Sequence, residues 1–397
     1  MAIARTNRLG PGAHTDVYDM PRQWWPGYVL GALLLGAGTG AAAFFGGQFA
    51  QFMLAGAQVV PFAVLALLAY LGVRHLWVGV LAFLWLGAVL FGLGMVSVLL
   101  VLAVRLAQAT TAGANSSAAL IGVVTSGEMA AAILWSLIGL GLAGVLLLPA
   151  VRQVVARQLP IDPTSPVHAV ALAVVCGATV ICFGQLFAAG GRPPILEMIT
   201  AMPAAVAQSS DIEQLLLIVY GFAWMLPGAL LAGGFPMVRT FGRALQRLGM
   251  VRPTARQVVG GIVVALLMVG GALVLDGVIG RLWEALTWPR TDSAAFEQLL
   301  GAAISPVGAV LIGVTAGLGE EMVVRVALQP RLGILLSNLF FTSLHAFQYS
   351  FDALLSVFIV GLVLGVVRAR ANTTTSSIVH GVYNFVLVMI AALALFE

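Results

Sequence analysis

The sequence predicts an all-α protein, a polytopic bundle of about eleven transmembrane helices. Of its 397 residues, 61% are hydrophobic and only 9% are charged, whereas soluble domains carry about 25% charged residues. The mean hydropathy of +1.05 agrees with this class. Apolar runs near the length of about 20 residues that crosses a bilayer recur along the whole chain. We place the spans near residues 27–45, 57–73, 77–104, 130–150, 168–189, 214–234, 257–280, 302–328, 332–349, 353–368 and 376–396.

The first 26 residues precede these spans and have a different character. They are polar, include Asp16 and Asp19, and end beside Trp24 and Trp25. An export signal has a short basic start and an apolar stretch, which this segment lacks. Tryptophan pairs commonly mark the headgroup layer. We therefore interpret residues 1–26 as a cytoplasmic lead-in to the first span.

The basic residues predict the orientation of the chain. All 19 are arginine, scattered through short loops, which is typical of topology signals rather than of a nucleic-acid surface. With the N-terminus inside, the inner segments hold most arginines, whereas the outer segments combine four arginines with six acidic residues. The positive-inside rule thus predicts a cytoplasmic N-terminus and an external C-terminus. We expect a multi-pass plasma-membrane protein, and the composition rich in Arg, Ala and Gly suggests a bacterium.

A basic stretch over residues 235–256 divides the chain. Its arginines alternate with spaced leucines, as in an amphipathic segment on the inner membrane surface. Before it, residues 27–234 form an apolar transmembrane extension without an evident role. After it, residues 235–397 hold the dense intramembrane polarity and form the second predicted domain.

Polar residues within apolar spans point to a functional site in this second domain. An ionisable side chain at membrane depth costs about 2.5–3.5 kcal/mol or more and marks function by default. Singly, each has a structural explanation, such as a packed histidine, an ion pair or an asparagine joining two helices. Their joint occurrence favours a site. The residues are Glu320, Glu321, Arg325, His345, His380 and Asn384.

Helical spacing relates these residues to one another. Glu321 and Arg325 are four residues apart on one face and can pair, which leaves Glu320 free to face a cavity. His380 and Asn384 share a face by the same spacing. At a rise of about 1.5 Å per residue from the inner loops, Glu320, His345 and His380 reach similar depths. One buried site open to the cytoplasm is therefore possible.

Two chemistries suit this set. A carboxylate in a dry cavity can act as a base toward water, while His and Asn side chains donate to a developing oxyanion. Alternatively, Glu320, His345 and His380 could bind Zn²⁺ and activate its water. Both suit amide hydrolysis, and the residue pattern leaves both open.

At these residues the chain resembles the CAAX prenyl protease 2 and bacteriocin-processing (CPBP) family of intramembrane proteases, also called the Abi family. Three motifs carry the resemblance: EExxxR at 320–325, FxxxH at 341–345 and HxxxN at 380–384. They occur in the family's order, and the resemblance covers roughly residues 235–397.

The resemblance implies an endopeptidase in which Glu320 activates water and His345 assists. His380 and Asn384 would stabilise the oxyanion, while Glu321 and Arg325 would shape the site. The implied partner is a membrane-embedded or lipidated peptide or protein. Both a metalloprotease and a metal-free Glu/His mechanism are argued for the family, so Zn²⁺ stays a possible cofactor.

Two other functions suit the same residues. The chain could be a non-catalytic immunity or scaffold protein that retains the fold. It could also be a proton-coupled transporter, because buried Glu, His and Arg residues build proton relays. Transporters commonly contain an internal repeat, which we do not find here.

Overall fold

The computed structural model describes residues 25–111, 113, 116–201 and 210–394, and this part of the chain is helical without a strand. The all-α prediction is therefore confirmed. The α-helices are α1 (Trp25–Ala41), α2 (Gly47–Ala55), α3 (Val60–Gly72), α4 (Leu76–Thr111), α5 (Ser116–Val124), α6 (Gly127–Leu146), α7 (Pro149–Val155), α8 (Pro166–Ala188), α9 (Pro194–Ala201), α11 (Asp211–Ala232), α12 (Phe241–Arg247), α13 (Ala255–Ala285), α14 (Ser293–Leu300), α15 (Pro306–Val314), α16 (Gln329–Leu344), α17 (Phe351–Arg370) and α18 (Thr373–Ala394).

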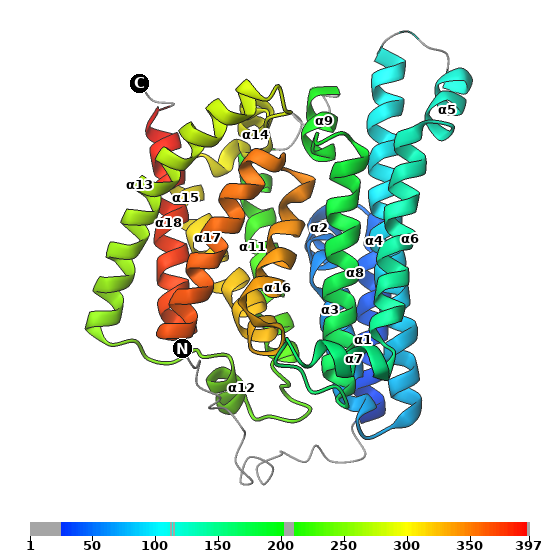
Figure 1. Ribbon diagram of the computed structural model, residues 1–397, viewed down its shortest axis with the longest axis vertical. Coiled ribbons are helices and arrows are strands. Elements are labelled where there is room, and N and C mark those ends of the chain that lie inside the picture. The colour runs from blue at the N-terminus through cyan, green and yellow to red at the C-terminus, as the bar shows by residue number, and fades with distance from the viewer. Residues whose placement is uncertain (1–24, 112, 114–115, 202–209, 395–397) are drawn as a thin grey trace.

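The long helices form two groups that lie side by side (Figure 1). Helices α3, α4, α6 and α8 pack around a core that includes Leu90, Leu172 and Ile181. Helices α13, α17 and α18 pack around Leu364 and Val379, and α15 packs against α18. Contacts of α8 with α16 and of α3 with α11 join the two groups.

The predicted count of about eleven spans is not confirmed. In the described residues, eight helices are long and apolar enough to cross a membrane, or nine if a bent pair of helices over residues 47–72 is one span. The candidates at 27–45, 57–73 and 332–349 form the shorter helices α1, α3 and α16, of 17, 13 and 16 residues. Apolar composition predicted these segments, but breaks in the backbone shorten the helices. In α16 the break is Gly333, whose φ is 75°.

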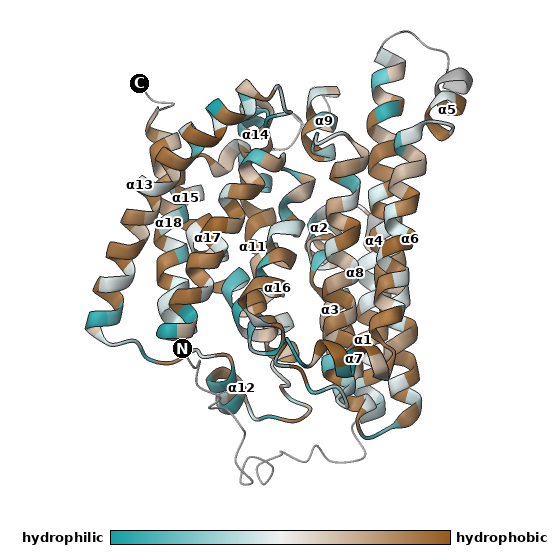
Figure 2. Ribbon diagram, in the orientation of Figure 1, coloured by the Kyte–Doolittle hydropathy of each residue, from teal (hydrophilic) through white to brown (hydrophobic). Residues whose placement is uncertain are grey.

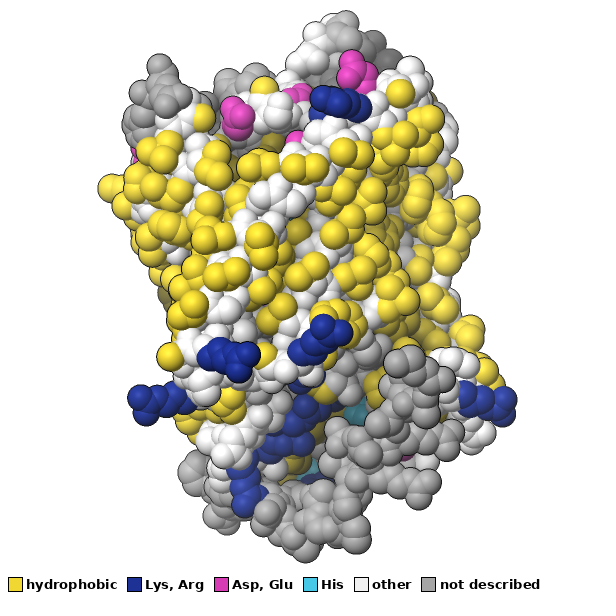
Figure 3. Space-filling view, turned by 60° about the vertical axis from the view of Figure 1, so that its left-hand side comes forward, with side chains coloured by type: hydrophobic (Ala, Val, Ile, Leu, Met, Phe, Trp, Pro, Cys, Tyr) yellow, Lys and Arg dark blue, Asp and Glu magenta, His cyan; other side chains and the backbone are white. Residues whose placement is uncertain are grey.

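Hydrophobic side chains form a broad belt across the face shown in Figure 3, and apolar residues predominate along the long helices in Figure 2. Large apolar side chains such as Leu84, Leu137 and Leu267 are exposed on it. So broad an apolar surface is stable only against lipid. In Figure 3, arginine side chains gather below the belt, and most of the visible acidic side chains lie above it. The chain is therefore a multi-pass membrane protein.

Glycines bring α18 against α15 and the segment that follows it. A Cβ atom on Gly317 would lie 2.6 Å from the carbonyl oxygen of Ser377 and 2.9 Å from Cα of Gly381. One on Gly313 would lie 2.9 Å from the carbonyl oxygen of Gly381. Only hydrogen fits at these positions, so the two backbones approach closely. This contact sets the distance between the first and third sequence motifs.

Helix α11 touches both groups of helices. It packs on α3, and on its other side Met225 lies against Gly319, directly before the acidic pair. The domain boundary at 234/235 stays a prediction, and α11 lies before it in the sequence. The segment carrying the first motif is thus covered by a helix from the predicted extension.

Candidate active site

Two π-helical turns carry the acidic pair. The helix that begins with α15 widens into π-helical segments at η4 (Thr315–Glu320) and η5 (Met322–Leu328), with Glu321 between them. Such turns are rare, and they occur frequently at functional sites. They leave Glu321 buried, with 1% of its side chain exposed, while 28% of the Glu320 side chain is exposed. The two carboxylates therefore have different surroundings, as their spacing predicts.

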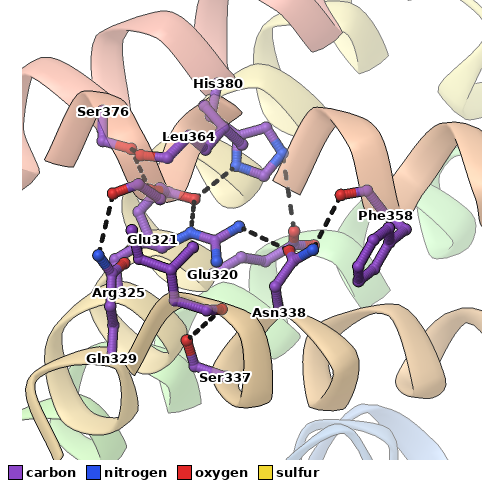
Figure 4. A network of polar contacts seen from close by, with 12 residues as sticks. Glu320, Glu321, Arg325, Gln329, Ser337, Asn338, Phe358, Leu364, Ser376 and His380 are labelled. Carbon is purple, nitrogen blue, oxygen red and sulfur yellow. Dashed lines mark hydrogen bonds and ion pairs between the residues drawn. The ribbon is translucent and has the colours of Figure 1, made fainter. Parts of the chain in front are cut away.

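Glu321 is the centre of a buried polar network (Figure 4). Its Oε1 lies 3.4 Å from Nε of Arg325, so the predicted i,i+4 pair is present. The same oxygen lies 3.1 Å from Nδ1 of His380 on α18. Oγ of Ser376 lies within hydrogen-bonding distance of Oε2 of Glu321 and of the carbonyl oxygen of Leu364. Three partners thus compensate for burying this charge.

His380 lies between the two carboxylates (Figure 4). Its Nδ1 faces Glu321, and its Nε2 is 3.9 Å from Oε2 of Glu320. The distance from Nε2 to Glu320 is too long for a direct hydrogen bond. A small movement would shorten it to hydrogen-bonding range, and a water molecule could bridge it. Donation from Nδ1 to Glu321 fixes the plane of the imidazole ring. The opposite nitrogen then points to the more exposed carboxylate.

Arg325 is fully buried and connects η5 to α16. Its Nη2 lies 3.5 Å from Oδ1 of Asn338, and its Cζ lies 5.3 Å from the ring centroid of Phe341. Among the described residues, its Nη1 has no hydrogen-bond partner. Arg325 therefore holds the acidic pair against α16 through one ion pair, one amide and one aromatic ring.

His345 is placed beside this network by the second motif. It directly follows α16, and its Nδ1 donates to the carbonyl oxygen of Phe341 at 3.0 Å. The centroid of the Phe341 ring is 4.8 Å from that of His345 and 6.2 Å from that of His380. The ring of Tyr349 stacks on His345, with the two centroids 5.9 Å apart. The aromatic ring of Phe341 thus contacts both motif histidines.

Asn384 is not part of the hydrogen-bonded network. It lies one turn beyond His380 on α18 and is half-buried. Within the described part of the chain, it makes no hydrogen bond to the other five predicted residues. The structure therefore gathers Glu320, Glu321, Arg325 and His380, adds His345 through Phe341, and leaves Asn384 at the edge.

Sequence reasoning missed two residues of the network. Asn338 is buried, accepts from Arg325 and donates through Nδ2 to the carbonyl oxygen of Phe358 at 2.8 Å. Ser376 contacts Glu321 from the first turns of α18. Asn338 precedes His345 by seven residues, two helical turns, and this spacing was the available signal. Ser376 lies in a run of small hydroxyl residues, so its spacing gave no such signal.

A metal site is not assembled from the predicted ligands. Within the described residues, no three His, Cys, Asp or Glu side chains are grouped so that they could hold a metal ion. Glu320 and His380 approach each other, whereas His345 contacts Phe341 and Tyr349. These residues do not fit a three-ligand zinc site in this arrangement, and we derive no step through a metal.

One segment of the chain matches a known family. Residues 302–386 match the family model described as Rce1-like, type II CAAX prenyl endopeptidase. Comparisons with curated proteins and with solved structures gave no match. The matched segment runs to α18 and contains all six predicted site residues. The resemblance predicted from the three motifs is therefore confirmed: over residues 302–386, the chain is similar to the Rce1-like type II CAAX prenyl endopeptidases.

Proposed function

We propose that this protein is an intramembrane endopeptidase that hydrolyses a peptide bond in a membrane-associated peptide or protein. The position of His380 supports this best, because Glu321 orients the ring and Nε2 faces the more exposed Glu320. A base and an oriented imidazole are the parts that hydrolysis of an amide requires. The family match over residues 302–386 supports the same reaction class.

In the proposed reaction, Glu320 takes a proton from water as the water oxygen attacks the carbonyl carbon. The new oxyanion accepts a hydrogen bond from Nε2–H of His380, which acts in this proposal as the doubly protonated imidazolium and donates its Nδ1–H to Glu321. The C–N bond then breaks, and Glu320 returns its proton to the leaving amine. Asn384, next to His380 on α18, is a second oxyanion donor in this proposal, and His345 assists from beside Phe341.

A cleavage assay in detergent tests this proposal. We would present quenched peptides, prenylated and not, to the wild-type chain and to Glu320→Gln. Glu284→Gln is the matched control, because Glu284 is exposed near the end of α13. We expect cleavage by wild type and control and a loss of about 10²–10⁴-fold in Glu320→Gln. Wild-type cleavage by Glu320→Gln would refute the role of Glu320, and no cleavage by wild type or either variant would favour a non-catalytic protein of the same fold.

Metal dependence is tested in the same assay. The proposed reaction uses side chains alone, so we expect activity to survive prolonged chelation. If chelation abolished cleavage and Zn²⁺ restored it, the zinc alternative would replace the proposed reaction. In that alternative, Glu320, His345 and His380 move together.

We also propose that the end of the bundle bearing α12 faces the cytoplasm of a bacterial cell. The arginines near α12, α16 and α17 lie at that end, and basic residues remain inside. Two reporters fused to the C-terminus test the orientation, one that is active only outside the cell and one that is active only in the cytoplasm. We expect the external reporter to be active.

A further inference from the structure

Four arginines from separate elements converge at the end of the bundle where α12 lies. Arg239 precedes α12 and Arg247 ends it, Arg331 lies in the first turn of α16, and Arg368 lies in the last turn of α17. Burial, followed by the charges of Arg331, Arg239 and Arg368, lowers the pKa of Arg247 to about 10. Arg247 therefore lies within electrostatic reach of the other three guanidinium groups. We call these residues the arginine cluster.

Neutral groups hold two members of the cluster in place. Nη1 of Arg239 donates to the carbonyl oxygen of Gly233 at 2.7 Å. Nη2 of Arg331 donates to the hydroxyl of Tyr70 at 2.6 Å, and Nη1 donates to the carbonyl oxygen of Ala327. These bonds fix the directions of the guanidinium groups but bring no negative charge to them.

Gly234 allows this arrangement. Its φ is 95°, a conformation that favours glycine. A Cβ atom there would lie 2.6 Å from Nη1 of Arg239 and 3.3 Å from Cζ of Tyr70. Because Gly234 has no side chain, Arg239 and Tyr70 can both pack against its Cα in the backbone turn after α11.

Few negative charges compensate the cluster: Glu321 lies within electrostatic range of Arg368 but forms no ion pair with it. In the part of the chain that the structure describes, none of its four residues forms an ion pair with a carboxylate. Arg331 is only 7% exposed, and none of the described residues accepts a hydrogen bond from its Nε. A buried guanidinium with an unused donor is costly, and neighbouring like charges add repulsion. An anion would relieve both.

We propose that the arginine cluster binds a phosphate group, supplied by the headgroup of an anionic phospholipid. Guanidinium groups bind phosphate through parallel hydrogen bonds, and a tetrahedral phosphate can accept from several of them. The cluster lies at the end of the membrane-spanning helices, where Figure 3 shows arginines gathering directly below the hydrophobic belt. Basic pockets between transmembrane helices at this level typically bind lipid headgroups.

A bound phosphate would also connect parts of the fold that otherwise repel one another. Arg239 and Arg247 belong to the segment around α12, whereas Arg331 and Arg368 belong to α16 and α17. One anion between them would tie this surface segment to the helices that carry the candidate active site. A ligand that binds only the folded state stabilises that state by RT ln(1 + c/Kd), where c is the free ligand concentration, so the unfolding temperature rises with the logarithm of that concentration.

Thermal unfolding in detergent tests this site. Wild type, Arg247→Gln/Arg368→Gln and the control Arg252→Gln/Arg256→Gln would be titrated with phosphatidylglycerol, phosphatidylcholine or inorganic phosphate. The control removes two exposed arginines from the same end of the bundle, so it matches the change in charge. We expect phosphatidylglycerol to stabilise wild type and control, and the cluster variant to need at least about tenfold more of it.

Comparing the three titrants distinguishes a phospholipid headgroup from free phosphate as the source of the bound anion. A response to phosphatidylglycerol alone assigns a lipid headgroup, and an equal response to inorganic phosphate assigns any phosphate group. No response in wild type, or an unchanged response in the cluster variant, would overturn the proposal. Native mass spectrometry of wild type needs no variant: we expect one phosphatidylglycerol to be retained, and its complete absence would count against the lipid source.

Discussion

At the scale of residues, the buried Glu321 decides how the site is built. It contacts Arg325, His380 and Ser376, which come from two different helical segments. Glu320, its neighbour in sequence, has a more exposed side chain and shares only the contact with His380. One carboxylate is thus enclosed by its partners, and the other is the one to which our proposal gives the chemistry. Adjacent residues can have such different roles because successive side chains point in different directions around a helix.

Replacing Glu321 should destabilise the protein because Arg325 would remain buried without its charge partner. For Glu321→Gln we expect a loss of about 3–5 kcal/mol in the free energy of unfolding. The double variant Glu321→Gln/Arg325→Met removes both charges and should recover most of that stability without recovering activity. Thermal unfolding in detergent measures this. A double variant as unstable as the single one would contradict the role of the pair.

The two asparagines should respond differently to alanine. Asn338 bonds to Arg325 and to the carbonyl oxygen of Phe358, so Asn338→Ala should cost about 1–3 kcal/mol of stability. Asn384 makes no such bond, so Asn384→Ala should unfold at the wild-type temperature while cleavage decreases. Unfolding and peptide cleavage would be measured on both variants. A destabilised Asn384→Ala would show that this residue is structural.

At the scale of elements, the close contact of α18 with α15 and η4 aligns His380 with the acidic pair. Gly317 and Gly381 make this contact possible because neither has a side chain to separate the backbones. The π-helical turns then direct Glu320 and Glu321 toward α18. The spacing between these elements, more than any single hydrogen bond, determines whether His380 reaches both carboxylates.

A methyl group at this contact should disturb both stability and catalysis. For Gly317→Ala we expect a loss of about 1–3 kcal/mol, because the new Cβ would meet backbone atoms that cannot move aside. The control is Gly270→Ala on α13, where nothing lies within 4 Å of the new atom. That control should be neutral or slightly stabilising. Equal unfolding temperatures for the two variants would refute the close contact.

At the scale of the whole molecule, the site depends on residues outside the segment that matches a known family. Helix α11 covers η4, and α8 packs against α16. The predicted extension over residues 27–234 therefore supplies walls around the site, whatever other role it has. A chain that lost these helices would expose the apolar faces of η4 and α16.

The predicted second domain should accordingly not fold alone. We expect residues 235–397, expressed as a fragment, to aggregate in detergent, and co-expression with residues 1–234 to restore a complex. Fluorescence-detected size-exclusion chromatography distinguishes these outcomes. A monodisperse, active 235–397 fragment would show that the extension is dispensable.

The sequence predicted local relations better than distant ones. The pair Glu321–Arg325 follows from helical spacing alone, and the helical class follows from composition. The approach of His380 to Glu321 depends on how α18 packs, which periodicity does not report. The spacing of Asn338 from His345 places it on the same helix face, but its contact with Arg325 depends on packing between η5 and α16 in the same way. The count of about eleven spans is not confirmed, because apolar composition does not reveal backbone breaks such as that at Gly333.

The most direct test of the central claim is mass spectrometry of peptide products formed in ¹⁸O-labelled water. Wild type should yield a product whose new carboxyl group carries one ¹⁸O atom from the attacking water. Glu320→Gln should unfold at the same temperature as wild type but yield almost no labelled product. The control Glu284→Gln should yield as much labelled product as wild type. Labelled product formed equally by Glu320→Gln, or no labelled product from any variant across the panel, would contradict the proposed role of Glu320.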